Sequence, residues 1–162
     1  MLTETVEKAL NEQINKELFS AYLYLSMAAD FESKNLSGFA KWMTAQAGEE
    51  LNHAMKLFNY VLERGGQVEL MAIDKPQQTW ESPLRAFQDA YDHEKFITQS
   101  IYGLLEIAQS AKDYGTMEFL QWYVKEQVEE EAQADRIVKK LEMIKDEPAG
   151  LFMLDHELGN RE

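Results

Sequence analysis

Six polar residues occupy positions where helical segments of this chain should bury apolar side chains. They lie near the middles of four segments: Glu17, Glu50, His53, Glu94, Gln127 and Glu130. Their spacing repeats, because 33 residues separate Glu17 from Glu50 and 33 also separate Glu94 from Gln127. An offset of 77 residues relates the first group to the second. Each half of the chain therefore supplies one lone carboxylate and one pair of polar residues at i and i+3. If the two halves pack as pseudo-symmetric units, all six residues lie at one height along the bundle.

Carboxylates gathered in a protein interior indicate a bound metal. Burying an ionised carboxylate costs on the order of several kcal/mol, and like charges at close range repel one another. A divalent cation offsets both costs. Oxygen ligands with a single imidazole nitrogen favour exchangeable iron over a closed structural zinc site, and glutamates with a Glu-x-x-His pair are typical of di-iron carboxylate bundles. The alternative is a structural bundle with a metal-free, hydrogen-bonded polar network or with solvated charges.

Four long helices must position these groups. The first is predicted over about residues 3–33, and the second runs from Ser37, taken as its N-cap, to the RGG at 64–66. The third starts at Pro83 behind the cap Ser82, and the fourth covers about 115–145.

The connection of 66–81 is long for a bundle. Its 16 residues can span on the order of 50 Å, whereas a helix of about 28 residues is roughly 42 Å long. Two antiparallel hairpins joined by such a crossover make an all-α, ferritin-like four-helix bundle. We expect a single domain over 1–162, with the bundle in 3–145 and a short fifth helix in 148–159.

Composition narrows the classes of function. The net charge of −13 argues against nucleic-acid binding, and the absence of cysteine excludes thiolate metal sites and disulfides. No run of 18 apolar residues predicts a membrane span, and no secretory signal is visible at the N-terminus. We therefore expect a cytoplasmic protein.

Four stretches resemble the four helices of bacterial non-haem ferritin: NKELFSAYLY, AGEELNHAMKLF, DHEKFITQSI and LQWYVKEQVEEEAQ. The resemblance covers essentially the whole chain, including a short C-terminal helix in AGLFMLDHEL.

The resemblance implies a set of iron ligands. Glu17, Glu50 and His53 would hold the first iron, with Glu50 as the bridge. Glu50, Glu94 and Glu130 would hold the second iron, with Gln127 beside the pair as a residue that contacts oxygen but binds no metal. A third, weaker iron position would use further carboxylates: Glu49, Glu126, Glu129 and Glu130. Tyr24 would lie near the site and donate an electron during oxygen reduction.

The resemblance also implies a function and an assembly. Fe(II) would be oxidised by O2 at the buried centre, and Fe(III) would be stored as a hydrated oxide inside a cage of 24 subunits with octahedral symmetry. No haem is expected, because Asn52 stands where bacterioferritin has its haem-binding methionine. Met117 and Leu120 replace the acids of the animal ferritin channel, so that route for iron is not predicted. The alternative function is a soluble di-iron oxidase or oxygenase that stores no mineral.

Overall fold

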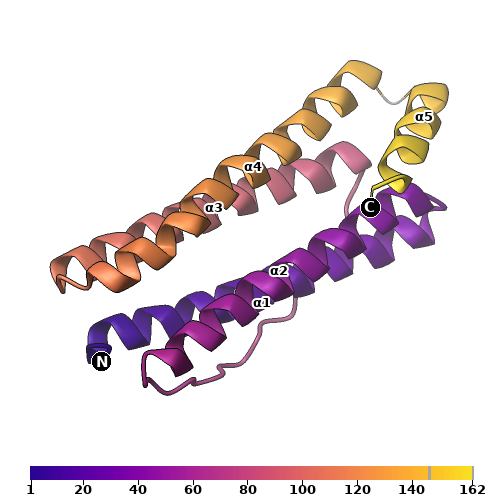
Figure 1. Cartoon of the computed structure of the whole chain (residues 1–162). Coiled ribbons are helices and arrows are strands. Elements are labelled where there is room, and N and C mark those ends of the chain that lie inside the picture. Colours follow the sequence, from indigo (N-terminus) through magenta and orange to yellow (C-terminus); the bar gives the residue numbers. More distant parts are fainter. Residues whose placement is uncertain (146, 162) are drawn as a thin grey trace.

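The computed structural model describes residues 1–145 and 147–161, and the described parts form helices and no strand (Figure 1). The helices are α1 (Glu4–Ser33), α2 (Ser37–Glu63), α3 (Pro83–Ser110), α4 (Tyr114–Ile144) and α5 (Pro148–Gly159). Within the described ranges, no helix is long and apolar enough to cross a membrane. This architecture confirms the predicted four-helix bundle with a short fifth helix.

Two antiparallel hairpins make the bundle, α1 with α2 and α3 with α4 (Figure 1). The crossover between α2 and α3 runs along α1, which holds it near both ends. The side chain of Asn11 donates to the carbonyl of Gln67 over 2.9 Å and accepts from the main-chain N of Glu69 over 2.8 Å. Asp30 accepts from the main-chain N of Trp80 over 3.2 Å. Since these contacts fix the crossover along α1, α3 begins near the end of α1 and runs antiparallel to it.

The buried apolar side chains form two clusters, and the polar level lies between them. One cluster lies toward the end that carries α5 and includes the stacked rings of Phe31 and Phe39, with centroids 5.1 Å apart. The other lies toward the N-terminal end of α1 and includes Leu10, Leu57 and Ile101. Because apolar layers flank the polar residues on both sides, they separate these residues from water along the bundle axis.

Most helix starts follow from local sequence. The side chain of Ser82 caps α3 by accepting from the main-chain N of Arg85, 3.1 Å away, as predicted. Asp113 caps α4 in the same way, accepting from the main-chain N of Thr116 over 3.0 Å.

The prediction that Ser37 caps α2 is wrong. Ser37 is the first helical residue, and the residue at the cap is Leu36, whose side chain accepts no hydrogen bond. The missing acceptor comes from α5, where Asp155 Oδ1 accepts from the main-chain N of Phe39 over 3.0 Å. Local sequence did not reveal this cap, because its acceptor is 116 residues away in the chain.

A glycine permits the contact between α5 and α2. A Cβ on Gly38 would lie 1.7 Å from the carbonyl oxygen of Asp155, closer than any packing allows. At Gly159 a Cβ would lie 3.1 Å from the Cα of Gly38. The two helices therefore meet backbone to backbone at this point, and α5 is fixed beside the start of α2.

Candidate metal centre

Carboxylate and imidazole atoms from all four long helices converge in the middle of the bundle. Three groups each offer ligand atoms within 4.8 Å of one another: Glu17, Glu50 and His53; Glu50, Glu94 and Glu130; His53, Glu126 and Glu130. Three residues each belong to two of these groups: Glu50, His53 and Glu130. With Gln127, which is bonded to Glu94, all six residues of the repeated spacing meet at one level.

The first group has a carboxylate oxygen without a partner. Glu17 Oε1 accepts from Gln13 Nε2 over 2.8 Å, but Glu17 Oε2 is buried and has no hydrogen-bond partner. This oxygen lies 3.9 Å from His53 Nδ1, and Glu50 Oε2 lies 3.2 Å from the same nitrogen. A buried carboxylate oxygen without a hydrogen bond is costly, and a cation next to His53 Nδ1 would remove that cost.

The second group is held by hydrogen bonds to Glu94. The Tyr24 hydroxyl donates to Glu94 Oε1, and Gln127 Nε2 donates to Glu94 Oε2 over 3.1 Å. Tyr24, Glu94 and Gln127 are all at most 2% exposed. The Gln127 amide also lies 3.2 Å from the main-chain carbonyl of Glu94, so its nitrogen faces α3. These contacts fix the carboxylate plane of Glu94.

Burial and mutual repulsion raise the pKa of every carboxyl in the first two groups. Burial, followed by repulsion from Glu50, raises the pKa of Glu17 to about 8. Burial raises the pKa of Glu94 to about 7, and burial with repulsion from Glu94 raises that of Glu130 to about 7. The pKa of Glu50 is raised well above its usual value by burial and by Glu94 and Glu130. Near neutral pH the metal-free site therefore holds protons that a cation would displace.

The donor set fits exchangeable ferrous iron. It has carboxylate oxygens, one imidazole and no thiolate, a combination suited to a hard or borderline cation that binds and leaves. Glu50 is the residue that the groups with Glu17 and with Glu94 have in common. The second nitrogen of His53, Nε2, lies 3.6 Å from Glu126 Oε1.

The residues expected at a third iron position do not all meet. Glu126 and Glu130 share a group with His53, whereas Glu49 and Glu129 belong to none of the three groups found among the described residues. Glu49 Oε2 instead pairs with Arg161 Nη2 over 2.8 Å. The Glu129 side chain is exposed.

Two glutamines that the sequence analysis did not select as site residues contact the cluster. Gln13 donates to Glu17, and Gln46 Nε2 donates to Glu50 Oε1 over 3.1 Å and to Glu130 Oε2 over 2.6 Å. Each glutamine precedes a cluster glutamate by four residues, a spacing that places the two side chains on the same helix face. That spacing could have identified both residues.

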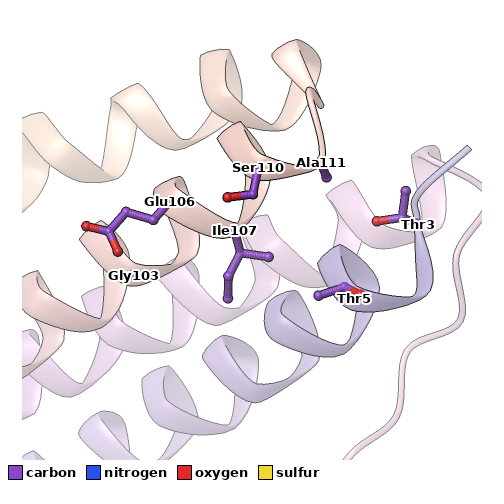
Figure 2. Close-up of a pocket in the computed structure, with 7 residues that line it drawn as sticks. All are labelled: Thr3, Thr5, Gly103, Glu106, Ile107, Ser110 and Ala111. Atoms are coloured by element: carbon purple, nitrogen blue, oxygen red, sulfur yellow. The ribbon is translucent and has the colours of Figure 1, made fainter.

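One hollow on the surface lies away from the cluster. It measures about 690 Å³ and lies between the start of α1 and the end of α3 (Figure 2). Thr3 and Thr5 line it from α1 and its cap, and Glu106 and Ser110 line it from α3. None of the clustered carboxylates lines this hollow.

Comparison with known proteins places the chain in a family. The family described as the ferritin-like domain matches residues 7–144. The bacterial non-heme ferritin of Bacteroides fragilis strain 638R is 42% identical over 161 residues, which are 99% of this chain and 100% of that protein. That of Campylobacter jejuni is 45% identical over 160 residues, which are 99% and 96% of the two chains. The crystal structure of an open pore ferritin from the archaeon Archaeoglobus fulgidus superposes with a TM-score of 0.99 at 52% identity and covers 100% of both chains. The chain therefore belongs to the ferritin family.

Proposed function

We propose that this protein oxidises Fe(II) with O2 at the buried cluster and stores Fe(III) as a hydrated oxide mineral inside a hollow cage. The observation that carries the proposal is the unpartnered Glu17 Oε2, buried beside His53 Nδ1 in the middle of the bundle. The names of the relatives, bacterial non-heme ferritins, agree with it. A cytoplasmic location belongs to the same proposal.

Fe(II) is the substrate, and the chain's carboxylates bind it in pairs. Glu17 and His53 would hold the first ion and Glu94 and Glu130 the second, with Glu50 between them. As the ions bind, the carboxyls whose pKa is raised release their protons. The positive charge of the ions also relieves the repulsion between the carboxylates. The two ions are thereby held side by side.

Two adjacent ferrous ions match the electron demand of one O2 molecule. Each Fe(II) gives up one electron, and with two protons the O2 becomes hydrogen peroxide while two Fe(III) form. The hydroxyl of Tyr24 donates to Glu94. Tyr24 would give one electron to the oxygen in place of one Fe(II), with its phenolic proton passing to Glu94. Gln127 holds Glu94 by its amide nitrogen and would also contact the oxygen. Because carboxylates exchange metal more readily than thiolates, Fe(III) can leave for the mineral.

A third iron would bind beside the pair, with Glu130 and the more exposed carboxylates Glu49, Glu126 and Glu129. For Glu49 this binding requires release from its ion pair with Arg161. We propose that the protein holds no haem and that iron is its substrate alone.

Storage requires a shell, and we propose 24 subunits in octahedral arrangement. Such a particle has a mass of about 450 kDa, the sum of 24 chains of 18.8 kDa. Size-exclusion chromatography with light scattering measures the mass, and electron microscopy of the particle distinguishes a closed octahedral cage from an assembly with open pores.

An aerobic Fe(II) titration tests the chemistry. The assembled protein should consume one O2 for each two Fe(II) in the first addition and should later retain Fe(III) in the particle. Glu50→Ala and His53→Ala should abolish the fast phase, whereas Glu12→Gln, an exposed glutamate of α1, should leave it unchanged. Fast oxidation that survives both cluster substitutions would refute the site. A monomer or small oligomer that oxidises Fe(II) without retaining it would instead favour a di-iron oxidase or oxygenase.

A further inference from the structure

The last described residue of the chain reaches the wall of the metal centre. Figure 1 shows the C-terminal end beside α2, where α5 docks. We propose that Arg161 is a positioning residue: through Gln46 it fixes the carboxylates of Glu50 and Glu130 for metal binding. This inference rests on the proposed function, since it assigns a role toward the same pair of metal ions.

The guanidinium of Arg161 is held on several sides. Nη2 donates to Glu49 Oε2 over 2.8 Å, and Nη1 lies 3.3 Å from the main-chain carbonyl of Trp42. The guanidinium carbon lies 4.5 Å from the centre of the Trp42 ring. Only 15% of the Arg161 side chain is exposed. A planar donor held by a carboxylate, a carbonyl and an aromatic face keeps one orientation.

That orientation determines which way the Gln46 amide faces. Arg161 Nη1 donates to Gln46 Oε1 over 3.0 Å, and a guanidinium can only donate. The amide oxygen of Gln46 must therefore face Arg161, and its NH2 must face the centre. There it donates to Glu50 Oε1 over 3.1 Å and to Glu130 Oε2 over 2.6 Å. Gln46 is 1% exposed, so no bulk water competes for these bonds.

The Gln46 amide determines which oxygens of Glu50 and Glu130 stay available for a cation. Gln46 occupies one oxygen of Glu50 on α2 and one of Glu130 on α4. The other oxygen of Glu50, Oε2, is the atom that lies 3.2 Å from His53 Nδ1. The amide thus holds together two carboxylates from different hairpins and leaves one oxygen of each for a cation. Partners of this kind commonly change metal affinity by about 10–100-fold.

A similar chain of hydrogen bonds, from α1 through Ser100 of α3 and back to α1, holds Glu17 at the other metal position. Lys16 Nζ donates to Ser100 Oγ over 2.8 Å, and Ser100 Oγ donates to Gln13 Oε1 over 2.6 Å. The Gln13 NH2 then donates to Glu17 Oε1 and leaves Oε2 unpartnered. In both places a donor on the outer side turns an amide so that its NH2 holds a site carboxylate.

Anaerobic titration of the assembled full-length protein with Co2+ tests the proposal, because cobalt absorption bands report coordination geometry without any oxidation. Arg161→Gln should weaken the cobalt ion held by Glu94 and Glu130 by about tenfold and change its spectrum. The ion held by Glu17 and His53 shares only Glu50 with that position and should weaken by less. Gln46→Leu should have the same effect. Adding Arg161→Gln to Gln46→Leu should cause no further loss, since Arg161 acts through Gln46. Arg161→Lys, which keeps a donor but not the planar fork, should fall between the wild type and Arg161→Gln.

The matched control is Lys140→Gln, which removes another ion pair of α5, that of Lys140 with Glu157. It should leave both cobalt affinities and the spectrum unchanged. The positioning role is overturned if the wild type binds two cobalt ions and Arg161→Gln binds them equally well, if Lys140→Gln has the same effect as Arg161→Gln, or if the losses from Arg161→Gln and Gln46→Leu add. A wild type that binds no cobalt at all refutes the proposed metal centre itself, and the positioning role with it.

Discussion

The main-chain N of Phe39 donates to Asp155 Oδ1 over 3.0 Å, so α5 supplies the cap of α2. This bond joins two residues that are 116 positions apart in the chain and fixes α5 beside the start of α2. A side-chain cap contributes about 1 kcal/mol to the helix that it ends. It also sets the direction in which the chain leaves α5, and therefore where Arg161 lies.

Removing that cap should loosen α5 more than it unfolds the bundle. For Asp155→Ala we expect a loss of about 1 kcal/mol in the free energy of unfolding and faster hydrogen exchange at the start of α2. Asp155→Asn keeps an acceptor oxygen and should retain most of the stability. Thermal unfolding and hydrogen exchange of the amides of 37–40 measure both effects. Equal exchange in Asp155→Ala and the wild type would contradict the capping role.

Adding a methyl group at Gly38 should displace α5. The Cβ of Gly38→Ala would lie 1.7 Å from the carbonyl oxygen of Asp155, so α5 must move or detach. At Gly48 no atom lies within 4 Å of an added Cβ, so Gly48→Ala is the control and should leave α5 in place. Limited proteolysis within α5 should become faster in Gly38→Ala alone, and the particle mass shows whether assembly depends on α5.

The metal-free protein should lose stability as the pH rises from about 5 to 8. The pKa of Glu17 is raised to about 8 and those of Glu94 and Glu130 to about 7, so the folded state holds protons that the unfolded chain releases near 4.5. The stabilisation from these protons is complete below the unfolded value and disappears as the pH passes the folded values. Thermal unfolding of chelator-treated protein at a series of pH values checks this direction. A Tm that rises steadily from pH 5 to 8 would contradict the raised pKa values.

Metal binding should show the opposite pH dependence. Below the pKa of the displaced carboxyl, a cation that displaces one proton binds about tenfold more tightly for each unit by which the pH rises. Cobalt affinity should therefore rise between pH 6 and 8. In Glu17→Gln one proton fewer should be displaced, so the logarithm of the cobalt affinity should rise less steeply with pH. The first ion should also bind weakly. Glu12→Gln keeps the cluster intact and should reproduce the wild-type slope.

The hydroxyl of Tyr24 should matter to oxidation more than to binding. Tyr24→Phe removes the donor to Glu94 Oε1, but Gln127 still holds the other oxygen of that carboxylate. We expect cobalt to bind within a few-fold of the wild type and the fast Fe(II) oxidation to slow by about tenfold. Stopped-flow oxidation measures the rate. Tyr22→Phe, at an exposed tyrosine of the same helix, should keep the wild-type rate.

Local sequence was sufficient to predict the helices and the inner positions of the cluster. Apolar residues at helical spacing determine which face of each helix is buried, and Glu17, Glu50 and Glu94 lie on those faces with repeated separations. The Ser82 cap was predictable because its donor is three residues away. The same i, i+4 spacing on one helix would have identified Gln13 and Gln46.

The tertiary structure decided the contacts between groups that are far apart in the chain. Sequence spacing gives no indication that Asp155 replaces Ser37 as the acceptor at the start of α2, or that Arg161 pairs with Glu49 and turns Gln46 toward the cluster. These contacts depend on the backbone approach of α5 to α2 at Gly38, over more than a hundred residues of intervening chain. The sequence by itself determined which side chains enter the core, because helical periodicity is local. Which atom of each side chain faces the metal position was decided by packing between elements, because a carboxylate or amide turns to satisfy whichever donors and acceptors the fold brings to it.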